Sequence, residues 1–90
     1  MEKPDFHFVF LHNEDPYEAD VWHYSQLTQN EVRAYNMKEN TYLIELKGPY
    51  EFKPFEIYIG EDLEWHTQST FVVEEELVQK IGLQIHNKSM

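Results

Sequence analysis

Several residue types are missing or scarce in this 90-residue chain, and each scarcity excludes a class of function. There is no cysteine, which excludes disulfides, thiolate nucleophiles and cysteine metal sites. The three glycines, Gly48, Gly60 and Gly82, are scattered, so no glycine-rich phosphate loop can form. Apolar runs such as residues 8–11 are far too short to span a bilayer, and the first residues do not form a signal peptide. We therefore expect a cytoplasmic protein without membrane association.

Basic residues are also scarce. Seven Lys and Arg stand against 17 Asp and Glu, which gives a formal net charge of −10. Such a charge repels nucleic acid and anionic membranes and favours basic partners. Hydrophobic residues still make up 41% of the chain and aromatic residues 16%, enough for one modest core. We expect a single acidic α+β domain over residues 1–90.

Five segments have the composition of β-strands. The first, at residues 5–12, has phenylalanine at alternate positions with Val9 and Leu11 between them, and apolar side chains on both faces predict a central strand. A loop at residues 13–17 follows it. The other strands are expected at residues 19–24, 41–47 and 55–59 and somewhere within 63–72.

Two helices are predicted. Thr28 and Glu31 form a capping box in front of a short helix at residues 29–38. Three acids open a second helix at residues 74–81, which Gly82 would end, with residues 83–86 as a brief strand or docked tail. The order β-β-α-β-β-β-α has only short connections. It predicts an antiparallel sheet of four to five strands with the two short helices packed on one face.

Candidates for chemistry are few. The histidines lack the i, i+4 spacing of a zinc helix; they are His7, His12, His23, His66 and His86. Glu61 and Asp62 are adjacent carboxylates, a pair that can serve acid–base chemistry or hold a divalent cation, but acidic turns are also common on solvated surfaces. Residues 33–53 carry only one more basic than acidic residue, too little for a phosphate-binding footprint. We predict no enzyme, no cofactor, no metal and no direct binding of nucleic acid.

The acids gather in two windows that contain no lysine or arginine. Residues 4–32 hold six acids and residues 54–79 hold seven. Alternate residues of a strand lie about 6.5–7 Å apart, of the same order as successive phosphates. Glu18 and Asp20 have this spacing, as do Asp62 and Glu64. The predicted partner-binding residues are Asp15, Glu18, Asp20, Glu61, Asp62, Glu64, Glu74, Glu75 and Glu76.

In its size, its lack of cysteine, its aromatic content and its one-signed charge, the chain resembles the small acidic DNA-mimic proteins that phages make. The resemblance includes no shared motif and assigns no role to a single residue. It implies an inhibitor in the host bacterial cytoplasm that blocks a basic DNA-binding protein of the host. A histone-like HU nucleoid protein is the first expected target, and a CRISPR effector or a nuclease is the next.

Two other interpretations stay open at this point. The acidic residues can simply form a well-solvated surface, since acids at a helix N-terminus stabilise the helix. The chain can also be an adaptor that binds through an aromatic patch, although core packing explains such rings equally well. The rings in question are Tyr17, Trp22, Tyr24, Tyr50, Tyr58 and Trp65. An unpaired edge of the sheet would leave room for a homodimer.

Overall fold

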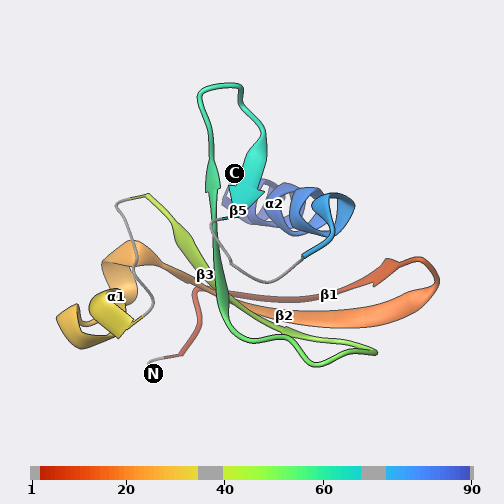
Figure 1. The fold of residues 1–90 in the computed structure, drawn as a ribbon, viewed down its shortest axis with the longest axis horizontal. Helices are drawn as coiled ribbons and strands as arrows, with labels where there is room; N and C mark the ends of the chain where they lie inside the picture. Colours follow the sequence, from red (N-terminus) through yellow and green to blue (C-terminus); the bar gives the residue numbers. More distant parts are fainter. Residues whose placement is uncertain (1–2, 35–39, 68–72, 90) are drawn as a thin grey trace.

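A computed structural model describes residues 3–34, 40–67 and 73–89 (Figure 1). The elements are β1 (Phe6–His12), β2 (Asp15–His23), the 3-10 turn η1 (Tyr24–Gln26), α1 (Gln29–Ala34), β3 (Tyr42–Lys47), β4 (Phe55–Ile59), β5 (Trp65–Thr67) and α2 (Glu75–Ser89). The predicted α+β class, the element order and the antiparallel sheet are confirmed. The predicted helical residues 35–38 and strand residues 68–72 lie outside the described part of the chain.

The sheet is a meander in which each strand pairs antiparallel with the next, in the order β1-β2-β3-β4-β5. β1 and β2 are joined by a two-residue turn. Asn13 and Glu14 have φ angles of 51° and 69° there, as in the turns whose twist matches that of the flanking strands. The predicted loop at residues 13–17 is therefore too long, because β2 already begins at Asp15.

The prediction that residues 5–12 form a central strand is wrong. β1 is an edge strand, and Val9 and Leu11 on its outer face are 64% and 67% exposed. Apolar residues on both faces of a strand indicate a central strand only when other elements cover both faces of the sheet. Here only one face is covered. The Nζ of Lys80 donates to the backbone oxygen of Leu11 (3.3 Å), a contact of the kind that protects an edge strand.

The core lies between α2 and one face of the sheet. Alternate residues of β1–β4 point to this face, which is the pattern that the period of two requires. α2 contributes an apolar stripe at helical spacing. The buried members of this core are Phe8, Tyr17, Ala19, Val21, Ile44, Leu46, Phe55, Ile57, Leu77, Val78, Ile81 and Ile85.

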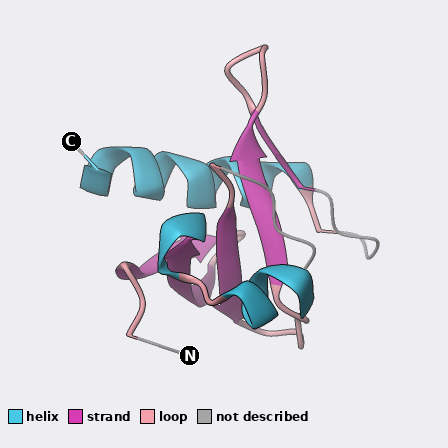
Figure 2. Cartoon of the chain, turned by 90° about the vertical axis from the view of Figure 1, so that its left-hand side faces the viewer, coloured by secondary structure: helices cyan, strands magenta, loops and turns pink. Residues whose placement is uncertain are grey.

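The two helices do not share a face, contrary to the prediction. Trp22 and Leu43 point away from α2, because they alternate with core residues of β2 and β3, and they form a second small cluster with Val32 of α1. α1 therefore covers one end of the opposite face (Figure 2). Its predicted capping box is confirmed: the amide of Thr28 donates to Glu31 Oε1 (2.9 Å) and the amide of Glu31 donates to Thr28 Oγ1 (3.2 Å).

α2 continues through Gly82 to Ser89, so the predicted helix end and the strand or tail at residues 83–86 are wrong. The glycine has a packing role in place of a capping role. It is buried, and a Cβ added to it would overlap the indole ring of Trp65 in β5. Ile81 and Ile85 continue the apolar stripe on either side of Gly82, which makes a longer helix more stable than an early end.

This contact predicts that Gly82→Ala destabilises the protein. In an ordinary helix the change would stabilise by about 1 kcal/mol. Here the overlap with Trp65 should outweigh that gain and lower the free energy of unfolding by about 1–2 kcal/mol overall. Urea denaturation measures the difference, with the exposed Leu83→Ala in the same helix as control. An increase in stability for Gly82→Ala would contradict the packing described here.

Candidate partner-binding site at the turn between β4 and β5

The nine acids predicted as binding residues fall in three regions. Glu61, Asp62 and Glu64 lie in the turn between β4 and β5, Glu74–Glu76 lie at the start of α2, and the others lie on β2. The start of α2 meets the β1–β2 hairpin where His12 Nε2 lies 3.1 Å from Glu74 Oε2. In the same hairpin, burial raises the pKa of Tyr17, and the charges of Asp15, Tyr50 and Glu74 raise it further. The turn between β4 and β5 lies apart from them and projects from the molecule at the top of Figure 1.

Glu18 and Asp20 point to the face of the sheet opposite α2, as their spacing predicts. Both bind His7, whose Nδ1 lies 2.6 Å from Asp20 Oδ1 and whose Nε2 lies 3.4 Å from Glu18 Oε1. In β3, Glu45 lies opposite Asp20 and Lys47 lies opposite Glu18. Sequence reasoning missed both β3 residues because only strand register brings them here. This face therefore mixes both signs of charge, unlike an uninterrupted acidic row.

The turn between β4 and β5 is closed by backbone hydrogen bonds. The amide of Gly60 donates to the Glu64 oxygen (2.9 Å), and the amide of Leu63 donates to the Gly60 oxygen (3.0 Å). The expectation that Asp62 and Glu64 project from one strand is wrong, because β5 begins only at Trp65. The acids of this turn are presented by a compact loop.

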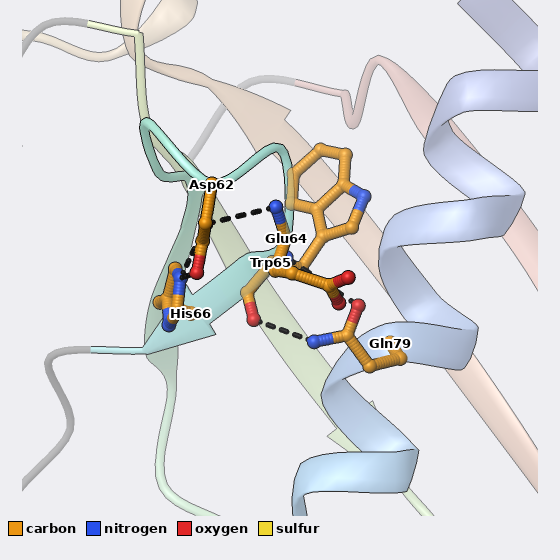
Figure 3. Close-up of polar contacts among 5 residues, drawn as sticks. All are labelled: Asp62, Glu64, Trp65, His66 and Gln79. Atoms are coloured by element: carbon orange, nitrogen blue, oxygen red, sulfur yellow. Dashed lines mark hydrogen bonds and ion pairs between the residues drawn. The ribbon is translucent and has the colours of Figure 1, made fainter.

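The Asp62 carboxylate helps to hold this loop in shape. Asp62 Oδ1 accepts from the Glu64 amide (3.0 Å), and both carboxylate oxygens lie 3.0 Å from His66 Nε2 (Figure 3). The hydrogen bond from His66, followed by that from the Glu64 amide, lowers the pKa of Asp62. Asp62 therefore remains ionised and fixed in direction, while Glu61 and Glu64 on either side are exposed.

The base of the turn is anchored to α2. Gln79 Nε2 donates to the backbone oxygen of Trp65 (2.7 Å), and Gln79 Oε1 accepts from the Trp65 amide (3.4 Å) (Figure 3). The indole ring of Trp65 also packs against Gly82. Sequence reasoning missed Gln79, since a single polar residue on a helix carries no signal of this contact. The anchor makes the turn a stiff projection from the core.

Leu63 at the tip of this turn is unfavourable for stability in two respects. Its φ of 64° is in the left-handed region, which costs a residue with a branched side chain roughly 1–2 kcal/mol. Its side chain is 83% exposed, so it adds almost nothing to the core. Strained, exposed apolar residues are typical of sites that are kept for binding. The amino-acid sequence does not reveal a positive φ at a leucine, so Leu63 could not be recognised as a candidate binding residue from the sequence.

The six aromatic residues of the adaptor interpretation do not form one exposed patch. Tyr17 and Trp22 are buried, and Trp65 packs against α2. Tyr24 and Tyr58 are half-buried, which leaves Tyr50, at 70% exposure, as the most accessible ring. Most of these rings therefore serve packing.

Comparison with protein-family models, with curated proteins and with solved structures finds no match to this chain. Among the described residues, no helix is long and apolar enough to cross a membrane.

Glu56 provides a test of the electrostatics on the sheet face opposite α2, where it lies across from Leu43. Burial raises its pKa above the ordinary 4.5, an effect that a hydrogen bond from its own backbone partly offsets. A raised folded pKa means that the folded state favours the protonated acid. The protonated Glu56 side chain therefore favours folding below its ordinary pKa, and this contribution to stability is lost as the pH rises through the folded pKa.

We expect Glu56→Gln to raise the melting temperature at pH 7, because the variant removes a partly buried charge. The gain should shrink as the pH falls to about 4 and below, where Glu56 is itself neutral. Thermal denaturation at both pH values measures it. Glu61→Gln, in an exposed turn, is the control and should show little change. A gain of the same size at both pH values would show that ionisation of Glu56 is not its cause.

Proposed function

We propose that this protein is a non-catalytic acidic binding protein that occupies the DNA-binding surface of a basic protein, as a DNA mimic does. The observation that supports this most directly is the turn between β4 and β5. Three carboxylates lie there within four residues on an anchored projection, and His66 is the basic side chain that contacts one of them, Asp62. The turn therefore holds its negative charges in a fixed position that projects beyond the rest of the molecule.

Physical chemistry favours such an arrangement for a basic partner. A chain of net charge −10 attracts a basic surface over a distance and speeds association. Fixed carboxylates lose little conformational freedom on binding, so more of the interaction energy appears as affinity. Asp62 is already held by His66 and the Glu64 amide. Glu61 and Glu64 remain free to meet Lys and Arg side chains of the partner.

The partner that fits this chemistry is a basic DNA-binding protein of a bacterial host, with a histone-like HU nucleoid protein as the first candidate. A CRISPR effector or a nuclease has the same kind of surface. The protein would then act in the host cytoplasm. Of the nine acids predicted as binding residues, those of the β4–β5 turn form the centre of the proposed interface. Those of β2 and the start of α2 contribute to the long-range attraction of the partner.

Leu63 favours a second candidate, an adaptor that binds through an apolar contact. A leucine that is 83% exposed at a strained φ can insert into a pocket of a partner, with the surrounding acids as a polar rim. The two candidates differ in their salt dependence. Binding through carboxylates weakens steeply as ionic strength rises, whereas binding through Leu63 does not.

The first test is competition between this protein and a DNA duplex for purified HU at about 0.15 M salt. Glu61→Gln combined with Glu64→Gln should weaken competition several-fold, because it removes the two free carboxylates of the turn. The matched control is Glu14→Gln with Glu51→Gln, which removes the same charge from exposed sites that are not among the nine acids. Equal weakening by both pairs would show that net charge acts without a site. Absence of competition by the unchanged protein at any salt, with nucleases and CRISPR effectors also unaffected, would overturn the proposal.

A second test separates Leu63 from the acids around it. Leu63→Gly relieves the positive φ, so the melting temperature should rise. If Leu63 is an apolar anchor, competition should fall at the same time, and the remaining binding should become more sensitive to salt. A more stable variant that competes fully would exclude the adaptor candidate and leave the charge-based one.

A further inference from the structure

Three side chains of metal-ligand type meet where the β1–β2 hairpin lies against the start of α2. His12 ends β1, Glu74 immediately precedes α2, and Glu76 lies in its first turn. One ligand atom from each of the three residues lies within 4.8 Å of the other two. His12 and Glu74 are 62 residues apart in the chain, so only the fold brings them together.

The imidazole of His12 is the distinctive member of this group. Its side chain is 1% exposed, and its Nε2 lies 3.1 Å from Glu74 Oε2. Its Nδ1 is buried and has no hydrogen-bond partner within the described part of the chain. A buried nitrogen without a partner costs about 1–3 kcal/mol, so stability alone does not favour a histidine at this position.

The neighbours of Nε2 make opposite demands on it. The Nδ2 of Asn13, 3.4 Å away, donates a hydrogen, so it needs a lone pair on Nε2. The carboxylate oxygen of Glu74 accepts a hydrogen, so it needs an N–H at the same atom. A neutral imidazole cannot supply both from one nitrogen. A cation between Nε2 and the carboxylates removes the conflict with Glu74, because both then act as electron-pair donors. The Nε2 lone pair then binds the cation, and the exposed amide of Asn13 can donate to water.

The acids alone would not indicate a site, since carboxylates at a helix N-terminus stabilise the helix by themselves. His12 is an independent observation, because it comes from another element, is buried at a cost in stability and faces the acids with Nε2. We propose that His12, Glu74 and Glu76 bind a divalent transition-metal ion of the zinc type. One imidazole and two carboxylates match the ligands of Zn²⁺, which binds both at about 2.0–2.2 Å, while the imidazole disfavours Ca²⁺ and Mg²⁺.

The exposed glutamates can adjust to this geometry. Glu74 and Glu76 are exposed, so their side chains can move inwards from the 4.8 Å arrangement, while the buried His12 stays fixed. Three protein ligands leave a position for water. The ion would link the β1–β2 hairpin to α2, and so it should stabilise the folded state. This inference does not depend on the proposed function, because the acids of the β4–β5 turn take no part and Glu74 and Glu76 contribute there only to the long-range attraction of the partner.

The test is titration of chelator-treated, full-length protein with Zn²⁺ by calorimetry, with the melting temperature as a second readout. Unchanged protein should bind one ion and melt at a higher temperature with Zn²⁺ present. Glu76→Gln should weaken binding at least tenfold, because it removes one ligand and leaves the contact between His12 and Glu74. The matched control is Glu75→Gln, which removes the same charge from the neighbouring position of the same helix turn and should bind Zn²⁺ as the unchanged protein does.

The outcomes decide the proposal without reference to activity. Equal weakening by Glu75→Gln and Glu76→Gln, or Ca²⁺ bound as tightly as Zn²⁺, would show attraction to acidic charge only and would overturn it. No heat and no change in melting temperature would also overturn it. Paramagnetic Mn²⁺ should broaden the ring signals of His12 before those of His7, and the reverse order would place the ion elsewhere.

Discussion

The contact of α2 with the sheet is the interaction on which the rest of the structure depends. α2 packs against β1 and β5, the two edge strands, and its apolar stripe fills the core between them. At one edge Gly82 and Gln79 hold Trp65, and with it the turn between β4 and β5. At the other edge the start of the helix meets His12. Both candidate sites are therefore positioned by the same helix, and a change in its packing would move both.

The acidic surface works against this packing, since self-repulsion destabilises a compact state of net charge −10. The fold places histidines beside some of these acids, where a ring N–H can donate a hydrogen bond to the carboxylate: His7 lies beside Glu18 and Asp20, and His66 lies beside Asp62. Within the described part of the chain, Glu61, Glu64, Glu75 and Glu76 form no ion pair with a basic side chain. An acidic surface kept at some cost in stability is understandable when a basic partner neutralises it.

Much of the fold could be predicted from the sequence because local rules and tertiary packing agree. The strands at Tyr42–Lys47 and Phe55–Ile59 and the cap at Thr28 follow from alternation, proline and glycine placement and capping chemistry. The errors arose where packing overrides a local rule. Gly82 has the sequence position of a helix end, yet the ring of Trp65 gives it another role. β1 is apolar on both faces, yet only one face is covered.

The candidate sites were harder to predict, for physical reasons. The acids of the β4–β5 turn could be named from charge alone, but the conformation of Leu63 depends on backbone geometry that no residue pattern encodes. The group around His12 depends on two elements far apart in sequence, so a search for ligand spacing along the chain cannot find it. The register that sets Glu45 beside Asp20 is equally invisible before the strands are paired.

Leu63 and His12 share one property that connects the two sites. Each departs from what stability alone would select: Leu63 is a strained and exposed leucine, and His12 is a buried imidazole with an unpaired nitrogen. Glycine would relieve the first and an apolar residue the second, so stability gives no reason to keep either. Each departure is also supported by rigid surroundings, the anchored turn for Leu63 and the α2 contact for His12. Binding sites commonly hold a strained or unsatisfied group in place with rigid surrounding structure. Here such groups lie at opposite edges of one sheet.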